Sequence, residues 1–162
     1  SGSLGQNFSV AAGMALAGKL DKKDYMVYIM LGDGELQEGQ IWEAAMAIPN
    51  LGLGNVVAIV DKNEAQLCDE CDKIMSLRDI GAKFEAFGWK VVEVDGHDWQ
   101  ALIDTFDSIE RKVDQQPTAI IAHTIKGKGV DFMEGTGAKW HGANFTKEQY
   151  EAAMASLGGD EE

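Results

Sequence analysis

Positive charge is scarce in this chain of 162 residues. It has 14 lysines and arginines against 27 aspartates and glutamates, which gives a formal net charge of −13. Because nucleic acid phosphates bind to basic surfaces, this balance argues against a nucleic acid partner. No apolar run approaches the roughly 20 residues that cross a bilayer, and we expect no signal peptide at the start. The sequence therefore predicts neither a nucleic acid partner nor a membrane partner.

Cysteine is also rare, since only Cys68 and Cys71 occur, in one C-x-x-C arrangement. A structural zinc site needs four ligands, and no second cysteine pair is present. A redox motif would open a helix directly after a strand, whereas these residues lie in a polar segment. We expect two reduced thiols at or near the surface. Nothing requires an oxidising compartment, so we predict a cytoplasmic location.

The remaining composition, 45% hydrophobic and 25% charged, is typical of a globular domain, and we predict a single domain over residues 1–162. Continuous apolar runs alternate with segments of helical periodicity. This alternation predicts an α/β fold, a mostly parallel sheet with helices on both faces. We expect strands over 25–31, 56–60, 89–94 and 118–123. We expect helices over 6–20, 38–48, 76–87, 99–113 and 147–155, a glycine-rich loop over 127–142 and an exposed acidic tail over 158–162.

Two polar triplets close the first two predicted strands. Gly32-Asp33-Gly34 follows the first strand, and Asp61-Lys62-Asn63 follows the second. The carboxyl ends of neighbouring parallel strands meet at the edge where open α/β sheets bind ligands. A carboxylate and an amide oxygen beside glycines suit a divalent metal that holds a diphosphate, and such a cation would offset the acidic charge.

Simpler roles are compatible with the same residues. Asp33 could cap the following helix, and Asn63 could be an ordinary turn residue. A dinucleotide-binding fold is a weaker alternative, because no G-x-G-x-x-G follows the first strand. His97 is expected to stabilise its own turn, whereas Lys126 could either be solvated or neutralise phosphate.

The sequence motifs around these triplets resemble those of transketolase. They occur in transketolase order over nearly the whole chain: Gly2-Ser3-Leu4-Gly5-Gln6, Gly32-Asp33-Gly34-Glu35-Leu36-Gln37-Glu38-Gly39, Phe87-Gly88-Trp89, Asp95-Gly96-His97-Asp98, His123-Thr124-Ile125-Lys126-Gly127 and Trp140-His141-Gly142. The match is to the amino-terminal, diphosphate-binding domain, as in bacterial transketolases made of two polypeptides. This domain binds thiamine diphosphate with Mg²⁺ or Ca²⁺ in the family.

The resemblance implies which residues bind the metal and which lie close to the diphosphate. Asp33 and Asn63 would give side-chain oxygens to the metal, and Ala65 its backbone carbonyl. Gly32 and Gly34 would bring backbone close to the diphosphate.

The resemblance also implies residues around the reacting groups. Leu4 would pack against the cofactor ring, and His141 would lie near the diphosphate and the reacting carbonyl. Glu38 is similar to a glutamate that links the two active sites across the dimer interface. His123 is open between hydrogen bonding in the core and contact with cofactor or substrate.

The activity implied by the resemblance is transfer of a two-carbon ketol unit between ketose and aldose phosphates. The family has an upstream segment and a pyrimidine-binding domain that these residues do not contain. We therefore expect a pyrimidine-domain subunit or a carboxyl-terminal part as partner, homo-oligomers, and no turnover by the chain alone. A non-catalytic diphosphate-binding module, 1-deoxyxylulose-5-phosphate synthase and the 2-oxo-acid dehydrogenases are the alternatives.

Overall fold

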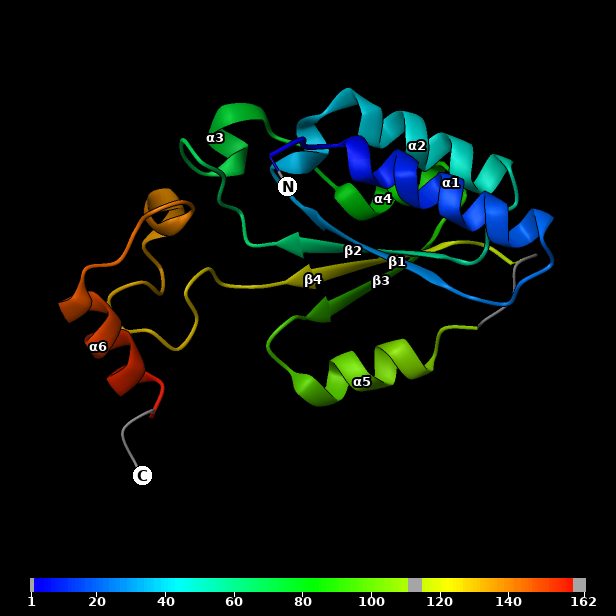
Figure 1. Ribbon diagram of the computed structural model, residues 1–162. Coiled ribbons are helices and arrows are strands. Elements are labelled where there is room, and N and C mark those ends of the chain that lie inside the picture. The colour runs from blue at the N-terminus through cyan, green and yellow to red at the C-terminus, as the bar shows by residue number, and fades with distance from the viewer. Residues whose placement is uncertain (1, 111–114, 159–162) are drawn as a thin grey trace.

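The computed structural model describes residues 2–110 and 115–158. Four parallel strands form one sheet in the order β1-β2-β4-β3. They are β1 (Val27–Gly32), β2 (Val56–Lys62), β3 (Lys90–Asp95) and β4 (Thr118–His123). One face carries α1 (Gln6–Leu20), α2 (Gly39–Asn50) and α4 (Ile80–Ala86), and the other carries α5 (Trp99–Asp107) (Figure 1). The predicted α/β fold with a parallel sheet is confirmed.

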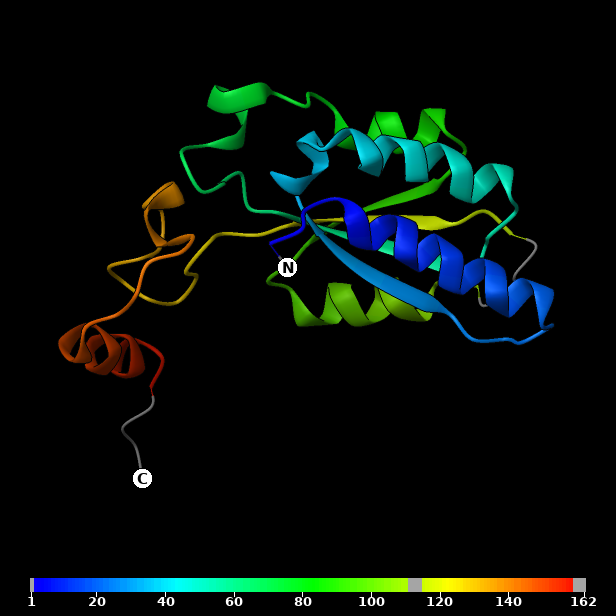
Figure 2. The ribbon, with the colours of Figure 1, turned by 45° about the horizontal axis from the view of Figure 1, so that its top comes forward.

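The main core lies between the sheet and the layer of α1, α2 and α4. Its largest fully buried side chains include Phe8 from α1, Leu31 from β1 and Phe84 from α4. Burial of each such side chain contributes about 1.5–3 kcal/mol. This core packs the strands, whose ends carry the polar triplets, against the helix layer that lies along one face of the sheet (Figure 2).

The register of the strands brings the two triplets together. Gly32 pairs with Asp61 across β1 and β2, and the Asp33 N–H donates to the Asp61 carbonyl at 3.2 Å. Asp33 and Asn63 therefore follow neighbouring strands at one edge of the sheet, as the sequence predicts. β1 begins at Val27, two residues later than expected, because Val27 is the first residue that pairs with β2.

α2 continues past its predicted end at residue 48 and includes Pro49. Pro49 has no N–H to donate to the Ala45 carbonyl four residues earlier. The indole N–H of Trp89 donates to that carbonyl instead, at 2.8 Å. Trp89 is buried, and Trp42 is half-buried against the same core.

Other helix boundaries also differ from the predictions. α4 starts four residues late, because Arg78 has a left-handed backbone (φ 56°) and the Asp79 carboxylate caps the helix by accepting the Ala82 N–H. α5 ends at Asp107, where the Ser108 hydroxyl donates to the Thr105 carbonyl; the predicted end at 113 lies outside the described residues. The polar segment 62–76 contains a short helix that the sequence did not reveal, α3 (Cys71–Met75).

The carboxyl-terminal part lies beyond the end of the sheet (Figure 1). It comprises the 127–142 loop, with a 3-10 turn over Gly137–Trp140, and α6 (Lys147–Ser156). Thr146 and Gln149 form a capping box at the start of α6 through reciprocal side-chain-to-backbone hydrogen bonds of 3.2 and 2.9 Å. Residues 159–162 of the predicted acidic tail lie outside the described part. None of the described helices has the length and apolarity needed to span a membrane.

Candidate functional site

A cavity of about 350 Å³ opens at the carboxyl ends of β1 and β2. It is lined by residues of several segments that are distant in sequence: the amino-terminal loop, the turn after β1, the segment after β2, and the loops after β4. The lining residues that the sequence singled out are Leu4, Gly32, Asp33, Gly34, Glu38, Asn63, Ala65, Lys126 and His141. The cavity thus brings together all predicted site residues except His123.

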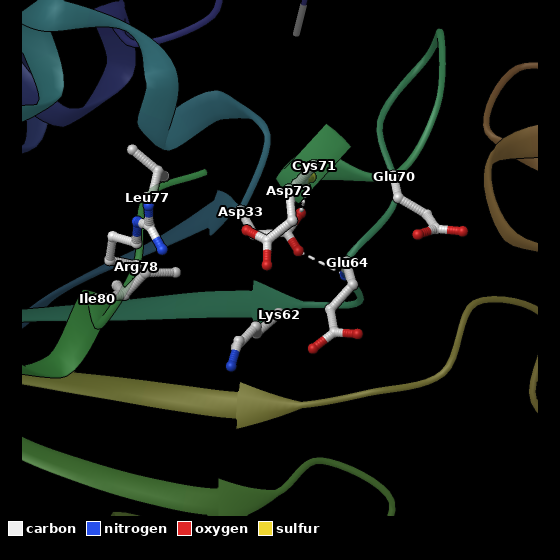
Figure 3. Close-up of a pocket in the computed structure, with 9 residues that line it drawn as sticks. All are labelled: Asp33, Lys62, Glu64, Glu70, Cys71, Asp72, Leu77, Arg78 and Ile80. Carbon is white, nitrogen blue, oxygen red and sulfur yellow. Dashed lines mark hydrogen bonds between the residues drawn. The ribbon is translucent and has the colours of Figure 1, made fainter. Parts of the chain in front are cut away.

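Asp33 is the most buried acidic group of this cavity, with 4% of its surface exposed. One carboxylate oxygen accepts the Glu64 N–H at 2.5 Å, as Figure 3 shows in a neighbouring pocket that Asp33 also lines. The other oxygen accepts the Gly34 N–H and the Cys71 thiol. Burial raises the pKa of Asp33, although these hydrogen bonds oppose the rise. Within residues 2–110 and 115–158, no lysine or arginine forms an ion pair with Asp33, so its charge lacks a compensating cation.

The amide of Asn63 is held in one orientation. Its Nδ2 donates to Asp61 at 2.9 Å, and its Oδ1 accepts the Ala65 N–H at 3.1 Å. Since a carboxylate only accepts hydrogen bonds, the Asp61 contact fixes which end of the amide carries the nitrogen. The Thr124 hydroxyl in turn donates to Asp61. Asp61, which also lines the cavity, is a positioning residue that sequence reasoning missed.

Close packing explains the glycine at position 34. A Cβ placed there would lie 2.9 Å from the Gln66 Cβ, a distance that real side chains do not adopt. The loop after β2 can therefore approach the turn after β1 only because residue 34 is glycine. Gly34 and Gln66 both line the cavity, together with Asp33 and Ala65.

The other predicted residues come from loops and a helix terminus. Leu4 is 49% exposed and lies just before α1, whereas Glu38 is the exposed N-cap residue of α2. His141 follows the 3-10 turn of the carboxyl-terminal loop. All three line the cavity, and the roles that the resemblance implies for them stay predictions.

Two of the open alternatives are clarified by contacts. Lys126 lines the cavity, whereas the Lys128 ammonium pairs with Glu134 at 2.7 Å. His97 stabilises a neighbouring loop as well as its own turn, because its Nε2 accepts the Ile125 N–H at 2.8 Å. His123 pairs with Glu93 at 2.7 Å and does not line the cavity, so its contact with a cofactor stays a prediction.

The residues present fit a diphosphate held through a divalent cation. Four carboxylates line the cavity, from Asp33, Glu35, Glu38 and Asp61, with only one lysine. A diphosphate would be repelled there without a cation, and the uncompensated Asp33 charge offers that cation a ligand. Among the described residues, no three histidine, cysteine or acidic side chains form a metal cluster. Most ligands of such a cation would therefore come from the amide, the backbone and the diphosphate itself.

Cys68 is exposed, as expected, whereas Cys71 is buried and the expectation of a thiol near the surface is wrong for it. The two cysteines are therefore predicted to differ sharply in reactivity. Burial, with the nearby Asp33 charge, raises the pKa of the Cys71 thiol to about 12, whereas Cys68 is exposed. At pH 8 about one Cys71 thiol in 10,000 is then the reactive thiolate. We expect iodoacetamide to alkylate Cys68 first and Cys71 only after unfolding, as peptide mass spectrometry can measure. In a Cys68→Ser control the fast adduct should disappear; equal rates at both cysteines would contradict the prediction.

Comparison with known proteins agrees with this geometry. Residues 1–162 match the family described as transketolase, thiamine diphosphate binding domain. One relative, a subunit of the apulose-4-phosphate transketolase of Phocaeicola vulgatus, is 47% identical over 156 residues, 96% of this chain and 55% of that protein. The 6-deoxy-6-sulfo-D-fructose transketolase subunit SqwG of Clostridium sp. strain MSTE9 is 41% identical, over 96% of this chain and 56% of that protein.

A solved structure shows the same fold. Transketolase from Campylobacter jejuni superposes with a TM-score of 0.87 at 30% identity, and the match covers 96% of this chain and 25% of that one. The chain thus spans about half the length of the two transketolase subunits named above.

Proposed function

The chain belongs to the transketolase family, as its thiamine-diphosphate-binding domain, and from this we propose that its cavity holds the diphosphate of the cofactor through Mg²⁺ or Ca²⁺. The observation that carries the proposal is the gathering of Leu4, Asp33, Asn63 and His141 around one cavity. Asp33 and Asn63 would bind the metal through side-chain oxygens, and Ala65 through its carbonyl. Gly32 and Gly34 would let backbone approach the diphosphate.

The remaining roles concern the reacting groups. Leu4 would contact the thiazolium ring, and the His141 imidazole would bond a substrate oxygen or relay a proton. Glu38 would connect two active sites across an interface. When bound, thiamine diphosphate supplies the carbanion chemistry of ketol transfer. What this chain supplies is binding, orientation and a hydrogen-bonding imidazole.

We propose sugar phosphates as substrates and transfer of a two-carbon ketol unit as the reaction. The names of two relatives refer to apulose 4-phosphate and to 6-deoxy-6-sulfo-D-fructose, so substrates vary within this group. Both names also denote one subunit of a larger enzyme, which supports a pyrimidine-domain partner. A cytoplasmic location and homo-oligomers are further parts of the proposal.

The loop over residues 127–142 provides the test. Five of its residues are glycines. Near its start, Lys128 forms an exposed ion pair with Glu134, and near its end the Trp140 ring stacks on the Phe145 ring with centroids 5.6 Å apart. We expect fast amide hydrogen exchange through this loop in the free chain and slower exchange with thiamine diphosphate and Mg²⁺. Thiamine with Mg²⁺ is the matched control and should protect little. Exchange that is already slow without ligand, or that thiamine slows equally, would contradict the proposal.

A further inference from the structure

One carboxylate, that of Glu35, joins two parts of the cavity that are far apart in sequence. Its Oε1 accepts the Gly5 N–H at 2.8 Å, and its Oε2 accepts the Gly32 N–H at 3.2 Å. Glu35 is half-buried and opens the 3-10 turn Glu35–Gln37 that follows the Gly-Asp-Gly turn. In the described part of the chain, no lysine or arginine forms an ion pair with it. The two backbone N–H groups are therefore its main partners.

Each of these N–H groups adjoins a residue with a proposed binding role. Gly5 follows Leu4 and has a left-handed backbone (φ 79°), so its conformation sets how the amino-terminal loop enters α1. Gly32 precedes Asp33 at the end of β1. The two hydrogen bonds therefore hold the Leu4 loop beside the Asp33 turn, and both segments line the cavity.

We propose that Glu35 is a positioning residue that couples the ring end of the cofactor site to its diphosphate end. The proposal rests on the proposed function, because Leu4 and Asp33 take these roles only if thiamine diphosphate binds. Glu35 would not touch the reacting atoms. It would keep the Leu4 loop at a fixed distance from Asp33, so that one ligand can use both ends without first ordering the loop.

The chemistry of the carboxylate suggests a selective substitution. Both oxygens of Glu35 accept, and both partners can only donate. Glutamine has the same length but one acceptor and one donor, so Glu35→Gln must lose one of the two hydrogen bonds. Glu85, an exposed residue of α4 outside the cavity, supplies the matched control variant Glu85→Gln.

The experiment uses the whole chain and measures the binding of two ligands and the hydrogen exchange of two backbone amides. Calorimetry measures the dissociation constants of thiamine diphosphate and of inorganic pyrophosphate, each with Mg²⁺. We expect Glu35→Gln to weaken thiamine diphosphate about tenfold and pyrophosphate less than threefold, because pyrophosphate occupies only the Asp33 end. In Glu35→Gln without ligand, NMR should show hydrogen exchange at the Gly5 or the Gly32 amide that is at least tenfold faster than in the unsubstituted chain. Glu85→Gln should change none of these values.

Each result decides for or against the coupling. An unchanged affinity for thiamine diphosphate, or equal losses for both ligands, would overturn it. If the unsubstituted chain binds neither ligand, the proposed function fails, and unchanged amide exchange in Glu35→Gln would separately show that Glu35 does not bridge the two segments. If Glu35→Gln does not fold, Glu35→Asp, whose shorter side chain cannot span both N–H groups, is measured in the same way.

Discussion

Replacement of Asp33 by alanine should weaken the binding of thiamine diphosphate at least tenfold, about 1.4 kcal/mol or more. The buried carboxylate has no cationic partner in the described part of the chain, and its cavity is lined by further acidic groups. Under the proposed function, a diphosphate binds there through a divalent cation on Asp33. Calorimetry of Asp33→Ala and of the unsubstituted chain, each with Mg²⁺ and with a chelator, measures the effect.

Asp33 also has a structural role that the controls must separate from metal binding. It accepts the Gly34 and Glu64 N–H groups, so alanine leaves buried donors unpaired, at about 1–3 kcal/mol each. Asp33→Asn keeps an acceptor oxygen and removes the charge. We expect it to fold more stably than Asp33→Ala while still binding the cofactor poorly. Asp107→Ala, an exposed residue at the end of α5, should bind normally.

One result would contradict this prediction. If the unsubstituted chain binds thiamine diphosphate equally well with Mg²⁺ and with chelator, no metal holds the diphosphate. The roles of Asn63 and Ala65 as ligands would then fall with that of Asp33. A loss of affinity in Asp33→Ala that Asp33→Asn fully restores would point to hydrogen bonding rather than to charge.

The part of the site on the sheet follows from local sequence patterns. Apolar runs locate β1 and β2, and parallel pairing then places Asp33 beside the segment of Asn63. Leu4 and His141 lie on loops, where no periodicity sets their position. The sequence placed them at the site only through the resemblance to transketolase, and the structure brings both to the cavity.

Contacts between distant segments account for what sequence analysis missed. Glu35 bonds Gly5 across 30 residues, and the Cys71 thiol reaches Asp33 across 38 residues. Neither contact has a signature in the residues beside it. The same holds for α2, which passes Pro49 because Trp89 of another segment satisfies the Ala45 carbonyl. A prediction from the sequence alone ends this helix too early, because proline usually interrupts a helix.

The largest effect is expected in the transferase assay. We expect no ketol transfer from xylulose 5-phosphate by this chain alone, with thiamine diphosphate and Mg²⁺ present. Activity should appear when a pyrimidine-domain subunit is added, because the proposed function requires that partner to complete the active site. In the reconstituted enzyme, His141→Ala should lower kcat by about 10²–10⁴-fold if the imidazole relays a proton.

The surface expected to bind a partner comprises the outward face of α1 and the face around Glu38 and Trp42. Phe8, Ala11 and Ala15 point into the core, whereas Val10 and Met14 are 59% and 54% exposed. An apolar stripe next to an open cavity is typical of an interface. We expect dimers or larger species in solution despite the charge of −13, as light scattering can measure.

Two matched substitutions locate that surface. Val10→Asp places a charge in the outward stripe of α1 and should reduce both association and reconstituted activity at least tenfold. Ile103→Asp changes a similarly exposed residue, 51% accessible, on α5 across the sheet, and should affect neither. A strict monomer in light scattering would remove the association claim. Ketol transfer by the chain without any partner would overturn the claim that it is inactive alone, because the 162 residues would then contain a complete active site.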